Sequence, residues 1–337
     1  MCEIASSPGS SPGLKALLAM TKWYMKNNII VCGALAYDCI MDFPGKFSDH
    51  ILPKKTHILN LSFTVSGVKE SFGGTGGNIA YNLAMLNEKP RLVAVAGKDF
   101  GKYKEWLVKN EIDISGVKAV KEAMTAKFYV ITDKADNQIG GYYPGSLTPL
   151  IHIYKGDKNT LAIIAPDIVV RMVKYAKIFR QMRVSYIFDP GQQVANYNEK
   201  ELRYSIKGAK MLIGNDYEIQ LILNKLKIKQ KQLEKLIEIL VITKGARGSE
   251  IYNKDKKIIV SAAKIKAVVD PTGAGDAYRA GFIKGLVMGL ELKKCARLAS
   301  IVAVYAVENQ GTQNHRFTWK EIKKRYRENY KIKNYAL

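Results

Sequence analysis

The sequence has few cysteines and histidines, and neither residue type forms a metal-binding pattern. Its 337 residues include four cysteines and four histidines, all well separated along the chain. No Cys-x-x-Cys pair and no His-Glu-x-x-His segment occurs. A disulfide-stabilised fold and a zinc centre are therefore not expected. Reduced thiols in a cytoplasmic protein are expected instead.

Long apolar runs are also missing. No stretch reaches the ~18 to 20 apolar residues that a membrane-spanning helix needs, so no membrane partner is expected. Residues 1–25 contain a segment rich in serine, proline and glycine at 6–13, and the apolar patch at 14–20 lacks the preceding basic residues of a secretory signal. We expect 1–25 to be a disordered leader.

Two common nucleotide-binding motifs are absent. The sequence has no Gly-x-x-x-x-Gly-Lys-Ser/Thr segment, and 74–79 fails the last position of Gly-x-Gly-x-x-Gly. These absences argue against a P-loop enzyme and a Rossmann-type dehydrogenase.

Acidic residues are fewer than basic ones, which gives a formal net charge of +23. Nucleic-acid binding is a hypothesis that such a charge permits. However, the densest basic segments, 225–235 and 320–327, include glutamates at helical spacing. They read as solvated helix faces, so no specific nucleic-acid partner is expected.

Strand-like and helix-like segments alternate along most of the chain, as in a mostly parallel α/β sheet. The expected strands are 29–33, 91–97, 185–189, 211–214 and 240–243, and helices are expected at 78–86 and 102–109. Two segments, 36–72 and 124–145, interrupt this alternation with short β-like runs and are expected to form a small lid. We expect one domain over 26–325 and a surface tail over 326–337.

The segment Asp-Pro-Thr-Gly-Ala-Gly-Asp at 270–276 is the most informative one. It follows an apolar run at 265–269, expected to be a strand, and precedes a helix-like run. Small residues before a helix leave its first N–H groups accessible, and the helix dipole favours an anion there. Asp276 places a carboxylate beside this anion site. That choice suits a base that takes a proton from a hydroxyl attacking phosphorus.

Residues 270–282 resemble the C-terminal signature of the ribokinase-like (PfkB) family of sugar and nucleoside kinases. The resemblance implies a three-layer α/β sandwich with a mostly parallel central sheet and a small β-sheet lid. It also implies that Asp276 is the catalytic base. The backbone amides of Gly273, Ala274 and Gly275 would then form an anion hole.

A second glycine-rich segment, 73–78, resembles the N-terminal signature of the same family. The resemblance implies that Gly74, Thr75 and Asn78 bind the acceptor and that Asp38 holds two of its hydroxyls. Ribokinases favour lysine where Thr75 stands, which weakens the case for free ribose. Tyr143 in the expected lid is a candidate for stacking on a purine base, although ordinary lid packing explains it equally well.

The expected donor is ATP with Mg²⁺. By resemblance, the ATP-binding candidates lie in three separate segments: Asn215, Thr243, Gly245, Gly248 and Asn309. Glu218, in an Asn-x-x-Glu motif, would position Mg²⁺ through water. Asp270 and Thr272 would order their loop, with K⁺ as a monovalent cation that some relatives use.

The sequence thus predicts an ATP-dependent kinase that phosphorylates the primary, 5′-type hydroxyl of a nucleoside, with adenosine favoured. The alternative within the family is a sugar kinase of the ribokinase or fructokinase type. Two alternatives from other classes are a basic nucleic-acid-binding protein and a non-catalytic ligand sensor. The resemblance also makes a homodimer an expectation.

Overall fold

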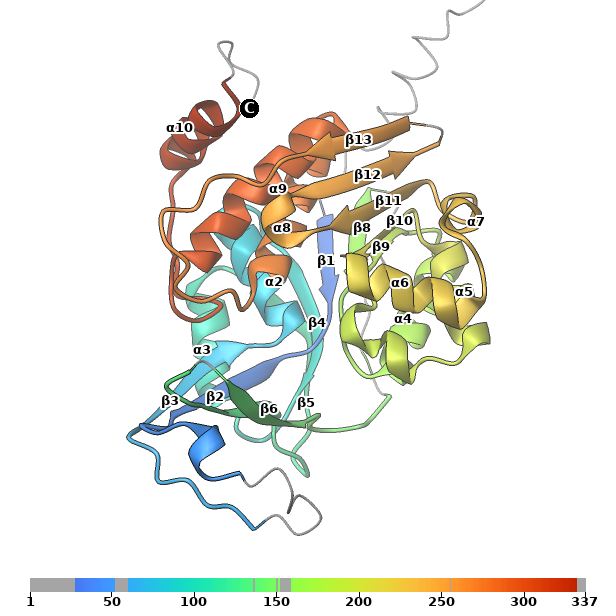
Figure 1. Cartoon of the computed structure of the whole chain (residues 1–337). Coiled ribbons are helices and arrows are strands. Elements are labelled where there is room, and N and C mark those ends of the chain that lie inside the picture. Colours follow the sequence, from blue (N-terminus) through green and yellow to red (C-terminus); the bar gives the residue numbers. More distant parts are fainter. Residues whose placement is uncertain are drawn as a thin grey trace, which may run out of the picture.

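A computed structural model describes residues 28–331, apart from 52–59, 136, 150, 152–158 and 255. Among these residues, nine strands form one sheet in the order β13-β12-β11-β10-β9-β8-β1-β4-β5 (Figure 1). The strands from β11 to β5 are parallel, whereas β12 and β13 add antiparallel at one edge. Their bounds are β1 Asn28–Cys32, β4 Arg91–Ala96, β5 Asp113–Ala119, β8 Thr160–Ile164, β9 Ser185–Phe188, β10 Met211–Asn215, β11 Ile239–Thr243, β12 Ser249–Asn253 and β13 Lys256–Val260.

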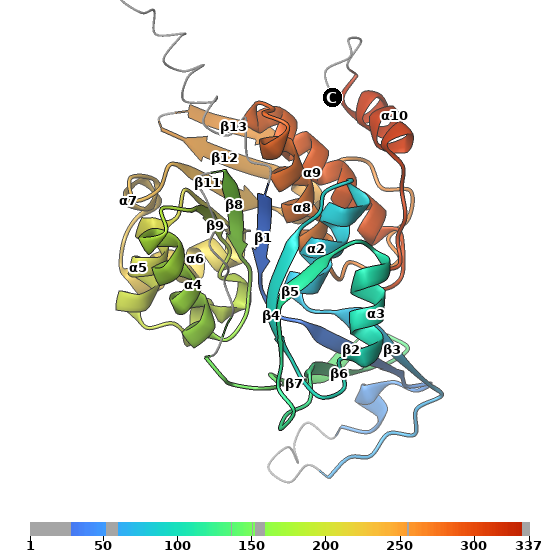
Figure 2. The same cartoon turned by 180° about the vertical axis from the view of Figure 1, so that it is seen from behind.

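Helices cover both faces of this sheet. In β1, Ile29 and Val31 pack on one side, while Ile30 and Cys32 pack on the other. A strand buried on both faces needs a continuous apolar run, and this explains why the central strands lack polar alternation. Figures 1 and 2 show the resulting three layers, as expected from the sequence.

The two helical layers have separate cores. The first layer contains α2 Thr75–Met85, α3 Gly101–Lys109, α8 Ala274–Val287 and α9 Leu292–Val307. The second contains α4 Val169–Gln181, α5 Glu199–Gly208 and α6 Asp216–Leu226. The short α7, Gln230–Glu234, follows α6, and α10, Trp319–Tyr330, packs against α9. Within the described ranges, no helix has the length and apolar character needed to cross a membrane.

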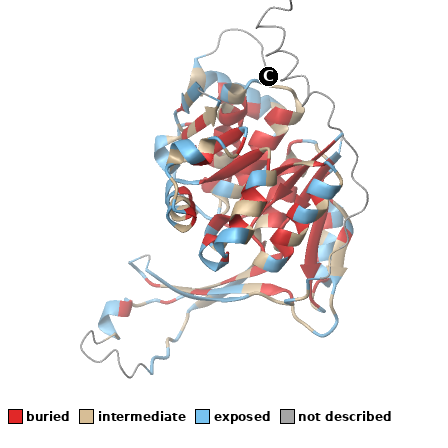
Figure 3. Cartoon of the chain, turned by 90° about the vertical axis from the view of Figure 1, so that its right-hand side faces the viewer, coloured by how far each residue is buried: buried red, intermediate tan, exposed pale blue. Residues whose placement is uncertain are grey.

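A second sheet forms the expected lid. Its strands are β2 Ala36–Asp42, β3 Gly67–Gly73, β6 Ala126–Thr132 and β7 Gln138–Tyr143, in the order β3-β2-β6-β7. Figure 3 shows this sheet extending from the buried body with much of its surface exposed. The two irregular segments predicted from the sequence thus lie side by side.

The strand expected at 265–269 is wrong. β13 ends at Val260, and Val268 and Val269 are 67% and 54% exposed. The N–H groups of Val269 and Asp270 both donate to the carbonyl of Val307, at 2.9 and 3.1 Å. The segment therefore packs against the end of α9 and adds no strand to the sheet.

The expected C-terminal tail begins too early. α10 continues to Tyr330, and Tyr326 is only 3% exposed because it packs in the core beneath this helix. The leader expected at 1–25 lies outside the described residues, as do 332–337.

Candidate active site

The site begins at the first turn of α8. Gly273 is the N-cap, with φ of 78°, and a Cβ there would lie 2.9 Å from Cγ2 of Thr312. Both facts require glycine. No side chain caps α8, and the N–H of its first residue, Ala274, donates to the Pro271 carbonyl at 3.3 Å, so the N–H groups that follow Ala274 are the ones that would meet an anion.

Asp276 lies in this turn and contacts the second glycine-rich motif. Nδ2 of Asn78 donates to Oδ2 of Asp276 at 2.9 Å, although the two residues are far apart in sequence. Burial raises the pKa of Asp276 to about 6, against the opposing effects of the Arg279 guanidinium and the Asn78 hydrogen bond. The carboxylate is therefore mostly ionised at neutral pH.

Asp38 brings the lid to the same place. Burial, together with the negative charges of Asp276 and Asp270, raises its pKa to about 7. A Cβ on Gly73 would lie 2.2 Å from Oδ2 of Asp38, so glycine makes room for this carboxylate. The three predicted residues Asp38, Asn78 and Asp276 thus lie close together where the lid meets the body.

Gly74 and Thr75 help to position α2 at this place. Gly74 is the N-cap of α2 with φ of 80°, and its neighbour Thr75 donates its hydroxyl to the Pro166 carbonyl at 2.6 Å. The N–H of Gly76 donates to the carbonyl of Ala34 at 2.9 Å, which fixes α2 against the end of β1. The glycine-rich motif at 73–78 therefore positions α2 as well as the Asn78 side chain.

Strand register shows which of the two lid tyrosines shares a face with Asp38. Asp38, Phe128 and Tyr142 are register partners across β2, β6 and β7, so their side chains share one face of the lid. Tyr143 pairs with Lys127 and points to the opposite face. Tyr142, 50% exposed, is therefore the tyrosine that shares a face of the lid with Asp38.

The Asn-x-x-Glu motif forms a capping box at the start of α6. The Asn215 side chain accepts the N–H of Glu218, and the Glu218 carboxylate accepts the N–H of Asn215, both at 2.8 Å. Asn215 and Thr243 are register partners at the carboxyl ends of β10 and β11. Ligands of open α/β sheets bind at this edge, as expected.

The other predicted nucleotide residues are held by local structure. Gly245 and Gly248 have φ of 54° and 90°, and a Cβ on Gly248 would lie 2.0 Å from the Val260 carbonyl oxygen. The Asn309 amide donates to the Tyr305 carbonyl at 2.8 Å, at the end of α9. The Asp270 carboxylate accepts the N–H groups of Thr272 and Gly311, both at 2.9 Å.

Sequence reasoning missed Arg279. It is buried, donates to Oδ1 of Asp189 at 2.8 Å and forms a close ion pair with the same carboxylate. Burial raises the pKa of Asp189 to about 7 despite this pairing. Arg279 lies three residues after Asp276, on the same helix face, and this spacing was the available signal. The guanidinium brings positive charge to the candidate base.

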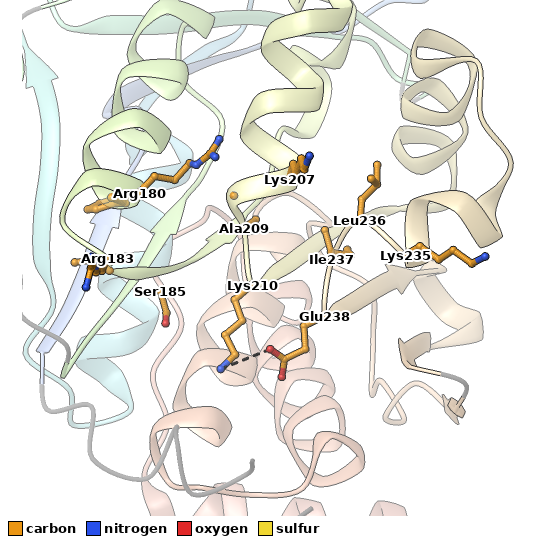
Figure 4. A pocket seen from close by; sticks show the side chains of 13 residues that line it. Arg180, Arg183, Ser185, Lys207, Ala209, Lys210, Lys235, Leu236, Ile237 and Glu238 are labelled. Carbon is orange, nitrogen blue, oxygen red and sulfur yellow. Dashed lines mark ion pairs between the residues drawn. The ribbon is translucent and has the colours of Figure 1, made fainter. Parts of the chain in front are cut away.

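A separate surface pocket of about 490 Å³ lies away from this site (Figure 4). It includes Ser185, Lys210 and Glu238, which lie at or just before the starts of β9, β10 and β11. Lys210 and Glu238 pair at 3.8 Å. The pocket therefore lies at the opposite edge of the sheet from Asn215 and Thr243.

Comparison with known proteins agrees with the fold and the motifs. Residues 29–319 match the model of the pfkB family carbohydrate kinases. The chain belongs to this family. It is therefore a phosphotransferase that acts on a hydroxyl group.

Its relatives include nucleoside kinases. One from Methanocaldococcus jannaschii is 32% identical over 79% of this chain and 89% of its own length. The structure of a Burkholderia thailandensis nucleoside kinase in complex with inosine is 30% identical, with a TM-score of 0.79, over 90% of this chain and 99% of that chain. The structure of the same enzyme in complex with ADP-inosine is 32% identical, with a TM-score of 0.77, over 90% of this chain and 96% of that chain.

Proposed function

We propose that this chain transfers the γ-phosphoryl group of ATP to the primary hydroxyl of a nucleoside, with Asp276 as general base. The 2.9 Å hydrogen bond from Asn78 to Asp276 carries the proposal. It joins the two glycine-rich motifs, and Asp38, on the lid strand β2, lies near the same carboxylate. A hydroxyl held by Asp38 and Asn78 would lie beside the carboxylate that deprotonates it.

The reaction needs few covalent steps. Asp276 takes the hydroxyl proton, the oxygen attacks the γ-phosphorus, and ADP leaves. The backbone N–H groups at Gly273–Asp276 and the guanidinium of Arg279 favour the negative charge of the transferred group. Such reactions depend mainly on positioning and electrostatics. A base with a pKa of about 6 suits proton transfer near neutral pH.

Two aromatic side chains support a nucleoside as acceptor. Phe128 and Tyr142 are register partners of Asp38 and lie on the same face of the lid as this carboxylate. Base stacking on an aromatic ring is worth about 1 to 3 kcal/mol in nucleic-acid sites. The nucleoside kinases among the relatives support the same class, and the inosine complex favours a purine. Adenosine is the acceptor that we propose, and a plain sugar is the alternative.

ATP and Mg²⁺ are the proposed donor and metal. Among the described residues, no cluster of three His, Cys, Asp or Glu side chains could hold a metal. This fits Mg²⁺, which keeps several waters and takes phosphate oxygens as ligands. Glu218 would hold it through water, although its Oε2 already accepts a backbone N–H. When bound, Mg²⁺ neutralises phosphate charge. A potassium site at Asp270 and Thr272 stays a prediction.

The test is Asp276→Asn. Asparagine keeps the size and the contact with Asn78 but cannot take the proton. We expect kcat to fall by about 10² to 10⁴, as for loss of a general base. ATP binding, followed by calorimetry, should stay within about twofold.

Asp113→Asn is the matched control. Asp113 begins β5, at the opposite edge of the sheet, and pairs there with Arg91 at 2.7 Å. This variant should keep wild-type turnover. Wild-type kcat in Asp276→Asn itself would show that another group is the base.

A further inference from the structure

A chain of hydrogen bonds, buried in its middle and partly buried at its two ends, leads from α3 to the proposed base. Nε1 of Trp106 donates to Oε1 of Gln313 at 2.9 Å. Nε2 of Gln313 donates to Oδ1 of Asn78 at 3.0 Å. Nδ2 of Asn78 then donates to Oδ2 of Asp276 at 2.9 Å. Gln313 and Asn78 are 2% and 4% exposed, so water has little access to their amides.

The direction of this chain is set at Trp106. An indole N–H can only donate, so it requires the oxygen of the Gln313 amide to face it. The Gln313 amino group must then face Asn78, which turns the Asn78 oxygen toward Gln313. The remaining amino group of Asn78 is left for Asp276. The indole N–H of Trp106, which can only donate, thus fixes the orientation of the Gln313 and Asn78 amides, each of which could otherwise exchange its oxygen and nitrogen positions.

A side branch at Tyr103 reinforces the same direction. Its hydroxyl donates to the Gly73 carbonyl at 2.7 Å and accepts the second N–H of Gln313 at 2.6 Å. Both amino hydrogens and the oxygen of Gln313 therefore have partners. A reversed amide would bring two oxygens together at Asn78 and leave the indole N–H unpaired, and unpaired buried polar groups are costly.

We propose that Trp106 and Gln313 are positioning residues that hold the amino group of Asn78 toward Asp276 and so keep the base ionised and aimed. This inference rests on the proposed function, in which Asp276 is the base. Neither residue is among those proposed to bind the acceptor or ATP. Their effect passes through Asn78, which serves both the acceptor and the base.

Several charged or titratable groups surround Asp276 besides this chain. They come from α8, α6, β2, the end of β9 and α3: Arg279, Glu218, Asp38, Asp189 and Tyr103. Burial raises the pKa of Asp276, and the Asn78 hydrogen bond opposes that rise. Because the other groups stay in place, weakening the Asn78 contact should raise the pKa of Asp276 further. The acid limb of the pH–rate profile should then move to higher pH.

The test compares Trp106→Phe and Gln313→Met with the control Trp319→Phe. Phenylalanine at 106 keeps an aromatic ring between Phe72 and Tyr81, whose ring centroids lie 5.6 and 6.0 Å from that of Trp106. It removes the N–H donor together with part of the ring, and for this reason Gln313→Met tests the same chain without changing the ring. Trp319 begins α10, where its loss changes a tryptophan remote from the chain of hydrogen bonds.

The profile of kcat/KM is measured from pH 5 to 9 with ATP and the best acceptor. For both variants we expect the acid limb to move up by about one pH unit, which follows from losing a hydrogen bond to a carboxylate. That shift means roughly tenfold lower kcat/KM on the acid limb and near recovery at pH 8 to 9. Trp319→Phe should keep the wild-type limb.

Thermal unfolding of each variant shows whether the variant is folded. A merely structural role would lower kcat/KM equally at every pH, and that result would overturn the inference. An unshifted acid limb in both variants would overturn it as well. Asp276→Asn separates the two claims. If this variant is inactive while the acid limbs of Trp106→Phe and Gln313→Met stay unshifted, Asp276 is still supported as the base, but Trp106 and Gln313 do not position it. If Asp276→Asn is active, both fail.

Discussion

Asp276 shows how one carboxyl group is adjusted by opposing influences. Burial raises its pKa, whereas Arg279 and the Asn78 amide favour the ionised form. The resulting value of about 6 leaves the group ionised at neutral pH yet basic enough to accept a proton. Arg279 also forms an ion pair with Asp189, to whose Oδ1 it donates at 2.8 Å, so its positive charge acts on two carboxylates.

The pH dependence of the reaction follows from these groups. Asp276 works as a base only when deprotonated, so activity should be present above its pKa of about 6 and be lost as the pH falls through it. Asp38, with a pKa raised to about 7, should steepen the acid limb because its neutral form holds hydroxyls less well. We expect kcat/KM to fall about tenfold per pH unit or more below pH 6. Constant kcat/KM down to pH 5 would contradict the assignment.

The sequence identified residues that belong to contiguous motifs, and it missed residues that meet only in the fold. Asp38, Asn78 and Asp276 do converge, as predicted. Arg279 was overlooked because its buried partner, Asp189, follows a different strand. Alternation along a strand assigns Tyr142 and Tyr143 to opposite faces of the lid, but only strand register shows which of them shares a face with Asp38.

At the scale of elements, the junction of β1, β3 and α2 depends on glycine. Gly74 follows the last residue of the lid strand β3 and is the N-cap of α2, and its φ of 80° is unfavourable for any residue with a Cβ. A Cβ there would also lie 2.5 Å from the Ala36 N and 2.6 Å from the Ala34 carbonyl oxygen. Lid, strand and helix are therefore fixed to one another at this point.

Gly74→Ala should accordingly lower the free energy of unfolding by at least about 2 kcal/mol, because strain and overlap add. Chemical denaturation measures this change. Gly101→Ala is the matched control, since a Cβ at this first residue of α3 meets no heavy atom within 4 Å. It should change stability by no more than about 1 kcal/mol, in the stabilising direction. Equal losses in both variants would show that the crowding at Gly74 is not limiting.

The lid was predictable as two β-like segments, but its pairing was not. Both expected segments supply strands, and β2 pairs with β6 in parallel although they lie far apart in the sequence. The run at 265–269 has strand-like composition, yet its backbone hydrogen-bonds to the end of α9. Local propensity cannot anticipate such a tertiary contact, because the two segments meet only after folding.

The whole molecule carries a formal net charge of +23. Its basic residues are distributed over several helices, and one group lines the pocket at the edge of the sheet opposite the candidate site. No regular basic surface with interleaved aromatic residues emerges from the sequence, and membership of the kinase family makes specific nucleic-acid binding unnecessary as an explanation. The homodimer stays a prediction.

The mostly parallel sheet was predictable because apolar strand-like runs alternate with helix-like runs, and the three layers were implied by the family resemblance. The end of the kinase domain was less predictable: the surface tail was expected to begin at 326, yet α10 continues to Tyr330, and Ile322 and Tyr326 pack in a core beside α9. Sparse apolar residues at helical spacing were enough to anchor it.

The central claim is that this family member phosphorylates a nucleoside. The most direct measurement is ADP release with ATP and Mg²⁺ over adenosine, inosine, guanosine, cytidine, ribose, fructose and fructose 6-phosphate. We predict the highest kcat/KM with a purine nucleoside, adenosine above all, and at least about tenfold less with any free sugar, which cannot stack on Phe128 and Tyr142. Turnover on a sugar with no response to any nucleoside would contradict the account.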